Sequence, residues 1–411
     1  MSDVMAVILS GGSGERLGVL TAERAVAALP FGGKYRVIDF CLSNCRHSDI
    51  VDVAIVTQHA PTSLHDHVGS GRSWDLDHRG GILILQPYTT RSHSGWYRGT
   101  ADAITQNWDV IEERRPDRVL VLSGDHVYRM NYRALMETHV ESGAAVTVAV
   151  TRVPPTETRR FGMATLGPEG RIEELVEKPE RAATPFGSMG IYLFDYELLA
   201  ERLRPRPVDL VLDVLRPAIA DGVPVQAHEF EGYWEDVGTV GSYYRSNLEL
   251  VAAAPRLALF DPRWPLLTRD EERPPVRVGD AARLEDSLVA NGCRVDGVVR
   301  RSLLFPGVRV QAGAEIEDSI VMADGVVARD ARVTRAIVDK YCRIGEGAVI
   351  GEPGSEDSGL TIVGKDAHVP ARAHVAGGAV VGVGAREDDF AGGVIDAAER
   401  TPSRPWYQEL V

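Results

Sequence analysis

Residues 287–351 read SLVANGCRVDGVVRRSLLFPGVRVQAGAEIEDSIVMADGVVARDARVTRAIVDKYCRIGEGAVIG. Valine or isoleucine recurs roughly every six residues in this stretch, with glycine, aspartate and asparagine between them. An α-helix would need an apolar period of about 3.6 residues, which is absent. A six-residue period is typical of hexapeptide repeats, in which each turn of a β-helix stacks on the turn before it. The pattern predicts such a β-helix, and a sandwich of short strands is the alternative.

The repeat also sets the predicted domain boundaries. It resumes over residues 361–382, so we expect a left-handed parallel β-helix over residues 283–385. The proline-rich stretch before it, residues 251–282, is typical of a connection between domains. Residues 1–250 form a different domain, and residues 386–411 show no assignable pattern. Two domains also suit a chain of 411 residues, which is long for one core.

The first 250 residues alternate short apolar runs with helical patterns. The runs at residues 4–10, 51–58, 118–125 and 144–153 predict buried strands. The amphipathic patterns at residues 101–115 and 130–143 each predict a helix. Strands that alternate with helices favour a Rossmann-like α/β domain, in which helices cover both faces of a parallel sheet.

Composition narrows the functional classes. Hydrophobic residues make up 44% and charged residues 25% of the chain, as in globular proteins. The net charge of −14 argues against a broad surface for nucleic acid or anionic membranes. No apolar run has the length of a membrane span or a signal peptide. The four cysteines form neither a CxxC pair nor a zinc-binding spacing, so we expect a cytoplasmic protein.

A glycine-rich turn, GGSGERL at residues 11–17, directly follows the first predicted strand. Glycines such as Gly11, Gly12 and Gly14 let backbone N–H groups approach a polyphosphate, and Arg16 adds a charged donor. No GK[ST] follows, so the turn is not a P-loop, and its spacing fits a dinucleotide fingerprint poorly. A plain tight turn is the alternative.

Three charged residues follow other predicted strands. Asp125 ends the run RVLVLSGD, where a carboxylate can hold Mg²⁺ beside a triphosphate, and a helix N-cap is the alternative. Lys178, next to Glu177, can bind a substrate phosphate as a point charge, and a solvated turn is the alternative. Asp236 supplies a second candidate carboxylate for the metal ion.

Seven ordered motifs resemble one family closely. They are GGSGERL, FGGKYRVIDFCLSNC, WYRGTADAITQN, SGDHVYRM, VEKP, SMGIYLFD and YWEDVGTVGSYYRSNLEL. In this order they resemble bacterial ADP-glucose pyrophosphorylases, the glucose-1-phosphate adenylyltransferase family. The resemblance covers residues 4 to about 350, and the repeats fit the family's C-terminal domain.

The resemblance implies a reaction in which a sugar 1-phosphate attacks the α-phosphate of a nucleoside triphosphate, with Mg²⁺ assisting and pyrophosphate leaving. It assigns catalysis to Arg16, Asp125 and Lys178, and the metal to Asp125 and Asp236. The implied nucleotide-binding residues are Gly11, Gly12, Gly14, Thr89, Thr90 and Gly124. The implied sugar-phosphate-binding residues are Tyr97, Gly162, Glu177, Lys178, Ser188, Gly190, Tyr192 and Trp234. The family also implies a homotetramer.

Two departures fall near the phosphates. The family segment RAKPA reads RAVAA here, so Val26 replaces a phosphate-contacting lysine. Loss of one preorganised charge costs about 3 kcal/mol, or about 10²–10³-fold in rate, unless Arg24 or Lys34 compensates. Glu23 stands where some members carry a basic residue associated with an allosteric activator, which argues against activation by a glycolytic phosphate.

Two further departures concern specificity. The base-reading segment PAQQR reads PYTTR at residues 87–91, and threonine cannot pair with adenine as glutamine does. The sugar-proximal HDFG motif is replaced in the segment VDLVLDVLRP, which retains Asp209 and Asp213 and indicates a less polar substrate.

The departures lie at ligand positions, which favours altered specificity over loss of activity. Our specific hypothesis is coupling of GTP, or another purine nucleotide, to a cyclitol phosphate such as valienol 1-phosphate in natural-product biosynthesis. The alternatives are an ordinary glucose-1-phosphate adenylyltransferase of glycogen synthesis and a non-catalytic regulatory subunit. An acyltransferase β-helix is a third, weak alternative, because the repeats offer only His368 and His374 as catalytic histidines.

Overall fold

The computed structural model describes residues 3–78, 81–89, 95–354, 359–397 and 399–403. Residue contacts divide the chain into two compact units that are interleaved along the sequence. The first unit comprises residues 1–13, 25–27 and 38–234, and the second comprises residues 14–24, 28–37 and 235–411. The sequence gives no sign of this interleaving, and the predicted boundaries near residues 250, 283 and 385 stay a prediction.

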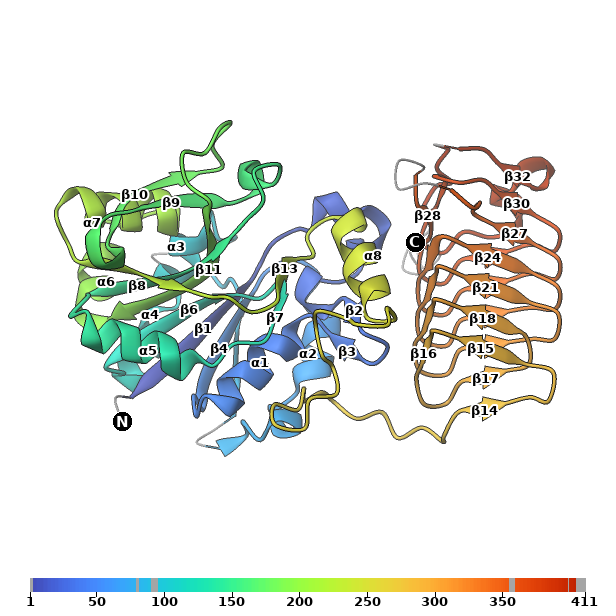
Figure 1. Ribbon diagram of the computed structural model, residues 1–411, viewed down its shortest axis with the longest axis horizontal. Coiled ribbons are helices and arrows are strands. Elements are labelled where there is room, and N and C mark those ends of the chain that lie inside the picture. Colours follow the sequence, from blue (N-terminus) through green and yellow to red (C-terminus); the bar gives the residue numbers. More distant parts are fainter. Residues whose placement is uncertain (1–2, 79–80, 90–94, 355–358, 398, 404–411) are drawn as a thin grey trace. The chain divides into compact units, whose positions relative to one another are not determined.

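The first unit is built on a nine-stranded sheet with the path β10-β9-β11-β6-β1-β4-β5, to which β8 and β12 are added beside β11 (Figure 1). Its strands are β1 (Val4–Ser10), β4 (Asp52–Thr57), β5 (Leu83–Leu85), β6 (Arg118–Ser123), β8 (Val146–Arg152), β9 (Gly162–Leu166), β10 (Ile172–Glu177), β11 (Phe186–Asp195) and β12 (Val225–Glu229). The short strand β7 (His126–Tyr128) follows β6. The helices are α1 (Ile38–His47), α2 (Thr62–Val68), α3 (Thr100–Gln106), α4 (Trp108–Arg114), α5 (Tyr132–Glu141), α6 (Tyr196–Leu203) and α7 (Arg216–Ala220).

The four predicted strands are confirmed as β1, β4, β6 and β8, but the sheet is mixed rather than parallel. Strands β5, β4, β1 and β6 run parallel to their neighbours. Strand β11 runs antiparallel to β6 and β8, and β9 runs antiparallel to β10. The connection between β9 and β10 is only residues 167–171, whereas a parallel pair would need a crossover of about a dozen residues or more.

One predicted helix is confirmed and the other is broken. The pattern at residues 130–143 forms α5, whose N-cap Asn131 accepts a hydrogen bond from the N–H of Arg133. The pattern at residues 101–115 forms two helices, α3 and α4, which meet at Asn107. Asn107 leaves helical geometry with φ −111° and ψ 19°, and its side chain donates to Ala103 O and Tyr97 Oη.

Both faces of the central strands are buried, as the sequence predicted. On one face Val7 of β1 and Val121 of β6 pack with Ile104 of α3 and Leu199 of α6. On the other face Ile8, next to Val7 in β1, is also fully buried. Burial on both sides explains why these strands are apolar throughout rather than alternating.

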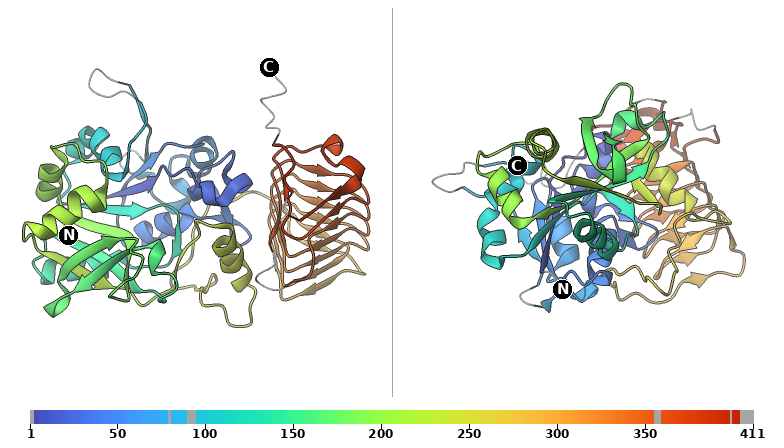
Figure 2. Two further views of the ribbon diagram at one scale, coloured as in Figure 1. Left: turned by 90° about the horizontal axis from the view of Figure 1, so that it is seen from above. Right: turned by 60° about the vertical axis from the view of Figure 1, so that its left-hand side comes forward.

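The second unit contains the predicted β-helix, which runs from β14 to β32 as three parallel sheets (Figures 1 and 2). The first sheet is β14 (Arg277–Val278), β17 (Arg294–Val295), β20 (Arg309–Val310), β23 (Val326–Val327), β26 (Arg343–Ile344) and β29 (His368–Val369). The second is β15 (Arg283–Glu285), β18 (Val298–Arg300), β21 (Glu315–Glu317), β24 (Arg332–Thr334), β27 (Val349–Ile350), β30 (His374–Val375) and β32 (Val394–Ile395). The third is β16 (Leu288–Val289), β19 (Leu303–Leu304), β22 (Ile320–Val321), β25 (Ala336–Val338), β28 (Thr361–Val363) and β31 (Val380–Val381).

The six-residue period reflects one inward-facing apolar residue on each side of the coil. In the first sheet Val310, Val327 and Ile344 are paired in register and lie in one buried core. The residues before β14 include no helix or strand from Leu250 to Val276. At the other end, the stretch that the sequence left unassigned supplies β32, which pairs with β30.

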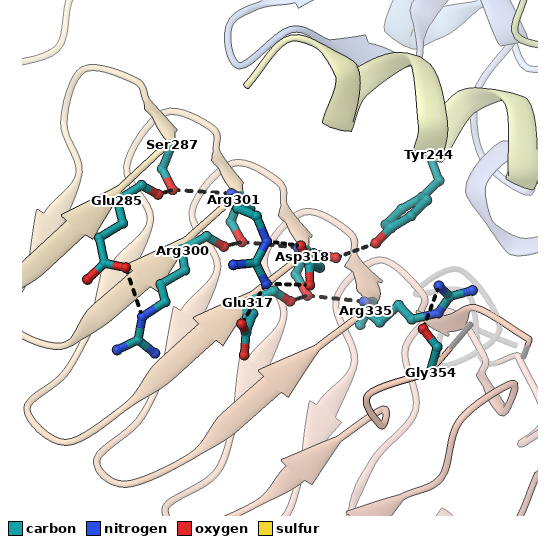
Figure 3. A network of polar contacts seen from close by, with 12 residues as sticks. Tyr244, Glu285, Ser287, Arg300, Arg301, Glu317, Asp318, Arg335 and Gly354 are labelled. Atoms are coloured by element: carbon teal, nitrogen blue, oxygen red, sulfur yellow. Dashed lines mark hydrogen bonds and ion pairs between the residues drawn. The ribbon is translucent and has the colours of Figure 1, made fainter. Parts of the chain in front are cut away.

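One corner of the β-helix carries a ladder of serine hydroxyl groups. Ser287 Oγ accepts from the N–H of Ser302, Ser302 Oγ accepts from Ser319, and Ser319 Oγ accepts from Ala336, at 3.2, 3.0 and 3.1 Å. The residue before each serine, such as Arg301 or Asp318, has a positive φ. Figure 3 shows the charged side chains that surround this corner.

The second unit also includes N-terminal segments and one helix. A 3₁₀ segment covers Glu15–Thr21, and β2 (Pro30–Phe31) pairs with β3 (Tyr35–Arg36). The chain passes from the first unit to the second within β13 (Trp234–Asp236), and α8 (Val240–Glu249) follows. Among the described residues, no helix is long and apolar enough to cross a membrane.

Candidate functional site

The glycine-rich turn begins at the carboxyl end of β1 in the first unit. A Cβ added at Gly12 would meet no atom within 4 Å, so the backbone there is open to a ligand. A Cβ at Gly11 would lie 3.5 Å from Cβ of Gln58, which follows β4. Gln58 Oε1 in turn accepts a 2.6 Å hydrogen bond from the N–H of Tyr97. Gln58 therefore links a predicted nucleotide residue to a predicted sugar residue.

Asp125 lies just beyond the carboxyl end of β6, as predicted. Ser123 Oγ donates to Asp125 Oδ1 at 2.5 Å, and 42% of the Asp125 side chain stays exposed. The next residues form β7, so the helix N-cap alternative is wrong. Gly124 is required, because a Cβ there would lie 2.2 Å from Ser10 Oγ. Asp125 is thus held in place and still open to a cation, which carboxylate oxygens suit.

His126 connects Asp125 to the predicted sugar pocket. Its Nε2 lies 3.5 Å from Asp125 Oδ1, and its Nδ1 donates to the carbonyl oxygen of Met189 at 3.1 Å. The ring packs edge-on against Trp234 with 5.1 Å between ring centroids. Trp234 also packs against Phe161 with centroids 4.9 Å apart. A predicted sugar-pocket residue therefore lies beside the predicted metal ligand.

Lys178 and Glu177 come from the end of β10. Lys178 Nζ lies 2.9 Å from Glu177 Oε1, and 61% of the lysine side chain is exposed. The lysine backbone has a φ of 45°, and its N–H donates to Phe161 O at 3.1 Å. A Cβ at Gly162 would lie 3.0 Å from Glu177 Oε2, so glycine gives the carboxylate room. The lysine is exposed and its backbone is anchored, which suits a phosphate-binding lysine.

The motif SMGIYLFD forms β11 and carries three predicted residues. Ser188 Oγ donates to Tyr192 Oη at 3.2 Å, and burial raises the pKa of Tyr192 to about 12. Gly190 has a φ of 68°, and a Cβ there would lie 3.1 Å from Cβ of Ser123. Because Ser123 binds Asp125, this strand meets the carboxyl end of β6. The first unit thus brings together most of the predicted sugar-phosphate residues and Asp125.

The second unit holds Gly14, Arg16 and Asp236. Gly14 has a φ of 67° at the start of the 3₁₀ segment, a conformation that favours glycine. A Cβ at Gly238 would lie 2.7 Å from Asp236 Oδ1 and 2.9 Å from Arg16 Nη2. The N–H of Gly238 donates to the same Asp236 oxygen at 2.8 Å. Arg16 and Asp236 therefore share the space in front of Gly238.

The assignment of Asp125 and Asp236 to Mg²⁺ stays a prediction. In the described part of the chain, one group of three ligand-type residues lies within mutual reach of a single ion, namely Asp75, Asp77 and His78. All three are exposed, and none belongs to the predicted site. A hollow of about 780 Å³ elsewhere on the first unit, lined by Trp108, Arg115 and Tyr196, also contains no predicted residue.

The base-reading segment is only partly described. Thr89 is exposed, whereas Thr90 and Arg91 lie outside the described residues. Tyr88 Oη donates to Gln106 O at 3.2 Å. The described part of this segment leaves the predicted nucleotide contacts untested.

The proposed substitutes for the missing lysine are engaged elsewhere. Val26 is 7% exposed and belongs to the core. Nη2 of Arg24 lies 2.9 Å from both carboxylate oxygens of Asp339, so its charge is already paired. Lys34 Nζ lies 5.6 Å from the ring centre of Tyr35. Arg24 therefore cannot replace a lysine at position 26 without breaking a buried ion pair.

The two aspartates retained from the altered sugar motif bind backbone groups. Asp209 Oδ1 accepts from the N–H groups of Val211 and Leu212 at 2.8 and 2.9 Å, which caps the helical turn Leu210–Leu215. Asp213 Oδ2 accepts from the N–H groups of Val208 and Asp209, and these bonds lower the pKa of Asp213. Their local structural role weakens the argument that this segment sets substrate polarity.

Four residues near the site were missed by the sequence analysis, namely Gln58, Ser123, His126 and Gly238. Ser123 and His126 stand inside the quoted motif around Asp125, so their proximity to the carboxylate could have drawn attention to them. Gly238 also stands inside a quoted motif, two positions after Asp236, whereas Gln58 ends an apolar run and nothing else in the sequence marks it.

Comparisons with known proteins agree with this fold. A family model described as Nucleotidyl transferase matches residues 5–252, and one described as GlmU-like, C-terminal hexapeptide matches residues 276–369. A glucose-1-phosphate adenylyltransferase of Thermomicrobium roseum is 46% identical over 97% of both chains. Proteins of the same name from Acetivibrio thermocellus and Pseudothermotoga lettingae are 40% and 39% identical over 90% and 95% of this chain, and over 90% and 96% of their own.

A nucleotidyl transferase sheet followed by hexapeptide coils defines the class of this protein, which is a nucleotidyltransferase enzyme. Within that class, the chain belongs to the glucose-1-phosphate adenylyltransferase family.

Proposed function

We propose that this enzyme is a glucose-1-phosphate adenylyltransferase, which converts ATP and glucose 1-phosphate to ADP-glucose and pyrophosphate. The observation that carries the proposal is the 46% identity, over 97% of both chains, to a relative with that name. The arrangement of Asp125, Lys178 and Glu177 around the edge of the first sheet supports it, because these groups suit phosphoryl chemistry.

The reaction needs no covalent intermediate on the enzyme. A phosphate oxygen of glucose 1-phosphate forms a bond to the α-phosphorus of ATP, and the bond from that phosphorus to the β-phosphate oxygen breaks. Pyrophosphate leaves with the electron pair of that bond. Positioning and charge neutralisation therefore carry the catalysis. Lys178 would orient the sugar phosphate, Arg16 the triphosphate, and Mg²⁺ held by Asp125 and Asp236 would neutralise developing charge.

The hypothesis of GTP with valienol 1-phosphate now has less support than its alternative. The relatives reported above are all named glucose-1-phosphate adenylyltransferase. In the apolar segment that motivated a less polar substrate, Asp209 caps the helical turn and Asp213 accepts hydrogen bonds from the N–H groups of Val208 and Asp209. Thr89 remains the chief argument for a base other than adenine.

A substrate matrix tests the proposal. Purified protein with Mg²⁺ is mixed with ATP, GTP, UTP or CTP and with glucose 1-phosphate or valienol 1-phosphate, and pyrophosphate release is measured. We expect the highest kcat/KM with ATP and glucose 1-phosphate. Faster turnover of GTP with valienol 1-phosphate would reverse the proposal. If the folded protein releases no pyrophosphate with any substrate pair, the alternative of a non-catalytic regulatory subunit is favoured.

Lys178→Gln tests the role assigned to the lysine. We expect a KM for glucose 1-phosphate raised about tenfold or more, because a charged hydrogen bond to phosphate is lost, and an unchanged KM for the nucleotide. Arg181→Gln, an exposed cation three positions further along, serves as the matched control. Equal effects of the two variants would place the sugar phosphate elsewhere.

A further inference from the structure

The segment Gly14–Arg24 of the second unit carries Arg16, the arginine of the glycine-rich turn, near one end. Arg16 Nη2 lies against Gly238, where the Asp236 carboxylate also lies. Between the two ends, Thr21 Oγ1 donates to the carbonyl oxygens of Gly14 and Gly18 at 2.9 and 3.2 Å. Leu17 and Leu20 are fully buried. The segment is therefore compact, so contacts that hold its end at Arg24 also restrict the position of its end at Arg16.

The other end of the segment is held by a buried ion pair. Arg24 Nη2 lies 2.9 Å from both oxygens of Asp339, and the two side chains are 4% and 0% exposed. Arg24 Nη1 also lies 3.8 Å from Sδ of Met322. Met322 and Asp339 directly follow the paired strands β22 and β25. Removing one partner of such a pair leaves an uncompensated buried charge, which is strongly destabilising.

Glu23 makes a second, less buried ion pair. Its Oε2 accepts from Lys365 Nζ at 2.7 Å, with side-chain exposures of 14% for Glu23 and 27% for Lys365. Lys365 follows β28 by two positions, as Lys340 follows β25, and these strands are paired in register. The two lysines are therefore neighbours on successive coils. Glu23 supplies the carboxylate that neutralises one of them.

A third contact joins the Asp236 side of the site to the same sheet. Tyr244 of α8 donates from its hydroxyl to the carbonyl oxygen of Asp318 at 2.5 Å (Figure 3). Asp318 precedes β22, which is followed in the third sheet by β25 and then β28. Helix α8 begins four residues after Asp236, with Thr239 as its N-cap. Three adjacent coils thus hold both chain segments that carry Arg16 and Asp236.

We infer that Asp339 and Lys365 are positioning residues for nucleotide binding, because through Arg24 and Glu23 they fix the segment that presents Arg16. This inference rests on the proposed function, since it assumes that Arg16 meets the triphosphate. It assigns the β-helix a direct part in the geometry of the reaction. None of its strands needs to touch a substrate for this effect.

Reversal of the Glu23–Lys365 pair tests the inference, because this pair is partly exposed and its variants are expected to fold. Glu23→Lys and Lys365→Glu each place like charges together. We expect each to lower kcat/KM for ATP by about tenfold, with the KM for glucose 1-phosphate unchanged. The double variant Glu23→Lys/Lys365→Glu restores the ion pair and should return kcat/KM for ATP to within about twofold of the wild type.

A matched control separates positioning from stability alone. Arg273→Gln breaks the Arg273–Asp324 pair of the same unit, whose two contacts are 2.7 and 2.9 Å, without touching residues 14–24. We expect a lower Tm and an unchanged KM for ATP. The inference is overturned if the Glu23 and Lys365 single variants change only Tm, or if the double variant is no better than the worse single.

The same proteins also separate this inference from the proposed function. If the wild type does not turn over ATP with glucose 1-phosphate, the proposed function fails, and ATP binding with Mg²⁺ is measured by equilibrium dialysis. Weaker binding by both single variants and recovery in the double variant would still support positioning. Equal binding by all four proteins, or binding by none, would overturn it.

Discussion

The sheet of the first unit and the β-helix use polar side chains in opposite ways. At the sheet edge, Asp125 and Lys178 stand at the ends of different strands and stay 42% and 61% exposed. At the β-helix corner, Ser302 and Ser319 repeat coil after coil, and neighbouring coils use their hydrogen bonds. Where different strands end at one sheet edge, their polar side chains remain available to a ligand. Where one coil repeats the next, the polar side chains form hydrogen bonds with the neighbouring coils. The β-helix contacts the segment Gly14–Arg24 where charges such as Asp339 interrupt its repeat.

The largest expected effect comes from removing the exposed carboxylate of the sheet. Asp125→Asn keeps the volume of the side chain and removes its charge. We expect kcat to fall by about 10²–10³-fold, as when one preorganised catalytic group is lost. Pyrophosphate release over a series of Mg²⁺ concentrations measures the effect, and far-ultraviolet circular dichroism checks the fold.

This difference between the sheet edge and the β-helix would be lost if removing an exposed carboxylate of the β-helix lowered kcat as much. Asp330→Asn, at a corner residue with positive φ, is the comparison, and we expect no change in kcat. A loss of rate equal to that of Asp125→Asn would show that the reacting groups are not confined to the sheet edge and its associated loops.

The next effect concerns the stacked core of the β-helix. Ile344→Ala removes a side chain that is 1% exposed and is paired in register with Val327 and Val369. We expect the free energy of unfolding to fall by about 2–5 kcal/mol, because a cavity is left between coils. Hydrogen exchange should quicken in the adjacent coils and stay unchanged in β1 and β6, since coils contact only their neighbours. Uniform acceleration in both units would contradict that picture.

A pH effect is expected from Lys340, which stands on the interrupted part of the repeat. Burial, together with the nearby cations Arg36 and Arg24, lowers the pKa of Lys340 to about 7, against the opposing influence of Asp339 and Glu271. The folded protein then binds fewer protons than the unfolded chain between about pH 7 and 10.5, so stability falls as the pH is lowered through that window.

Lys340→Met removes this titration. We expect it to raise the free energy of unfolding at pH 7 by roughly 1–3 kcal/mol and to flatten the dependence on pH between 7 and 10. Urea unfolding at several pH values measures both changes. A variant that is less stable than the wild type at pH 7 would show that the lysine is stabilised as a cation.

The smallest effect should come from one rung of the serine ladder. Ser302→Ala leaves the buried N–H of Ser319 without its acceptor, which costs about 1 kcal/mol. Ser287→Ala, at the half-buried start of the ladder, should cost less. If both substitutions are neutral in urea unfolding, the corner is held by the apolar core alone.

The sequence predicted the repeating parts of the fold better than the irregular parts. A six-residue period predicts the β-helix because each coil places its apolar residues in the same buried position, as for Val310 and Val327. The apolar runs also identified four strands, but the direction of β11 depends on non-local pairing that a local pattern does not encode. The break at Asn107 depends on hydrogen bonds to Tyr97 and Ala103, which the amphipathic pattern does not contain.

Prediction of candidate site residues depended on motifs that fix the backbone. Asp125, Lys178 and Gly190 were found because each follows or interrupts a strand within a recognisable motif. Gln58 was missed because it lies beside Gly11 only through the pairing of β1 with β4, which is a later strand in the chain. Arg24 was considered as a phosphate ligand, although its partner Asp339 lies 315 positions away. Contacts of that range leave no trace in a single sequence.

The ion pair between Glu23 and Lys365 has a consequence for the synthesis of the protein. Its partners are 342 positions apart, so the first-made loop depends on one of the last-made coils. At roughly 5–20 residues per second, about 20–70 s separate their appearance from the ribosome. During that interval the sheet of the first unit can form while the segment from Gly14 to Arg24 lacks its partners Asp339 and Lys365. The segment therefore gains its ion pairs with Asp339 and Lys365 only late in translation.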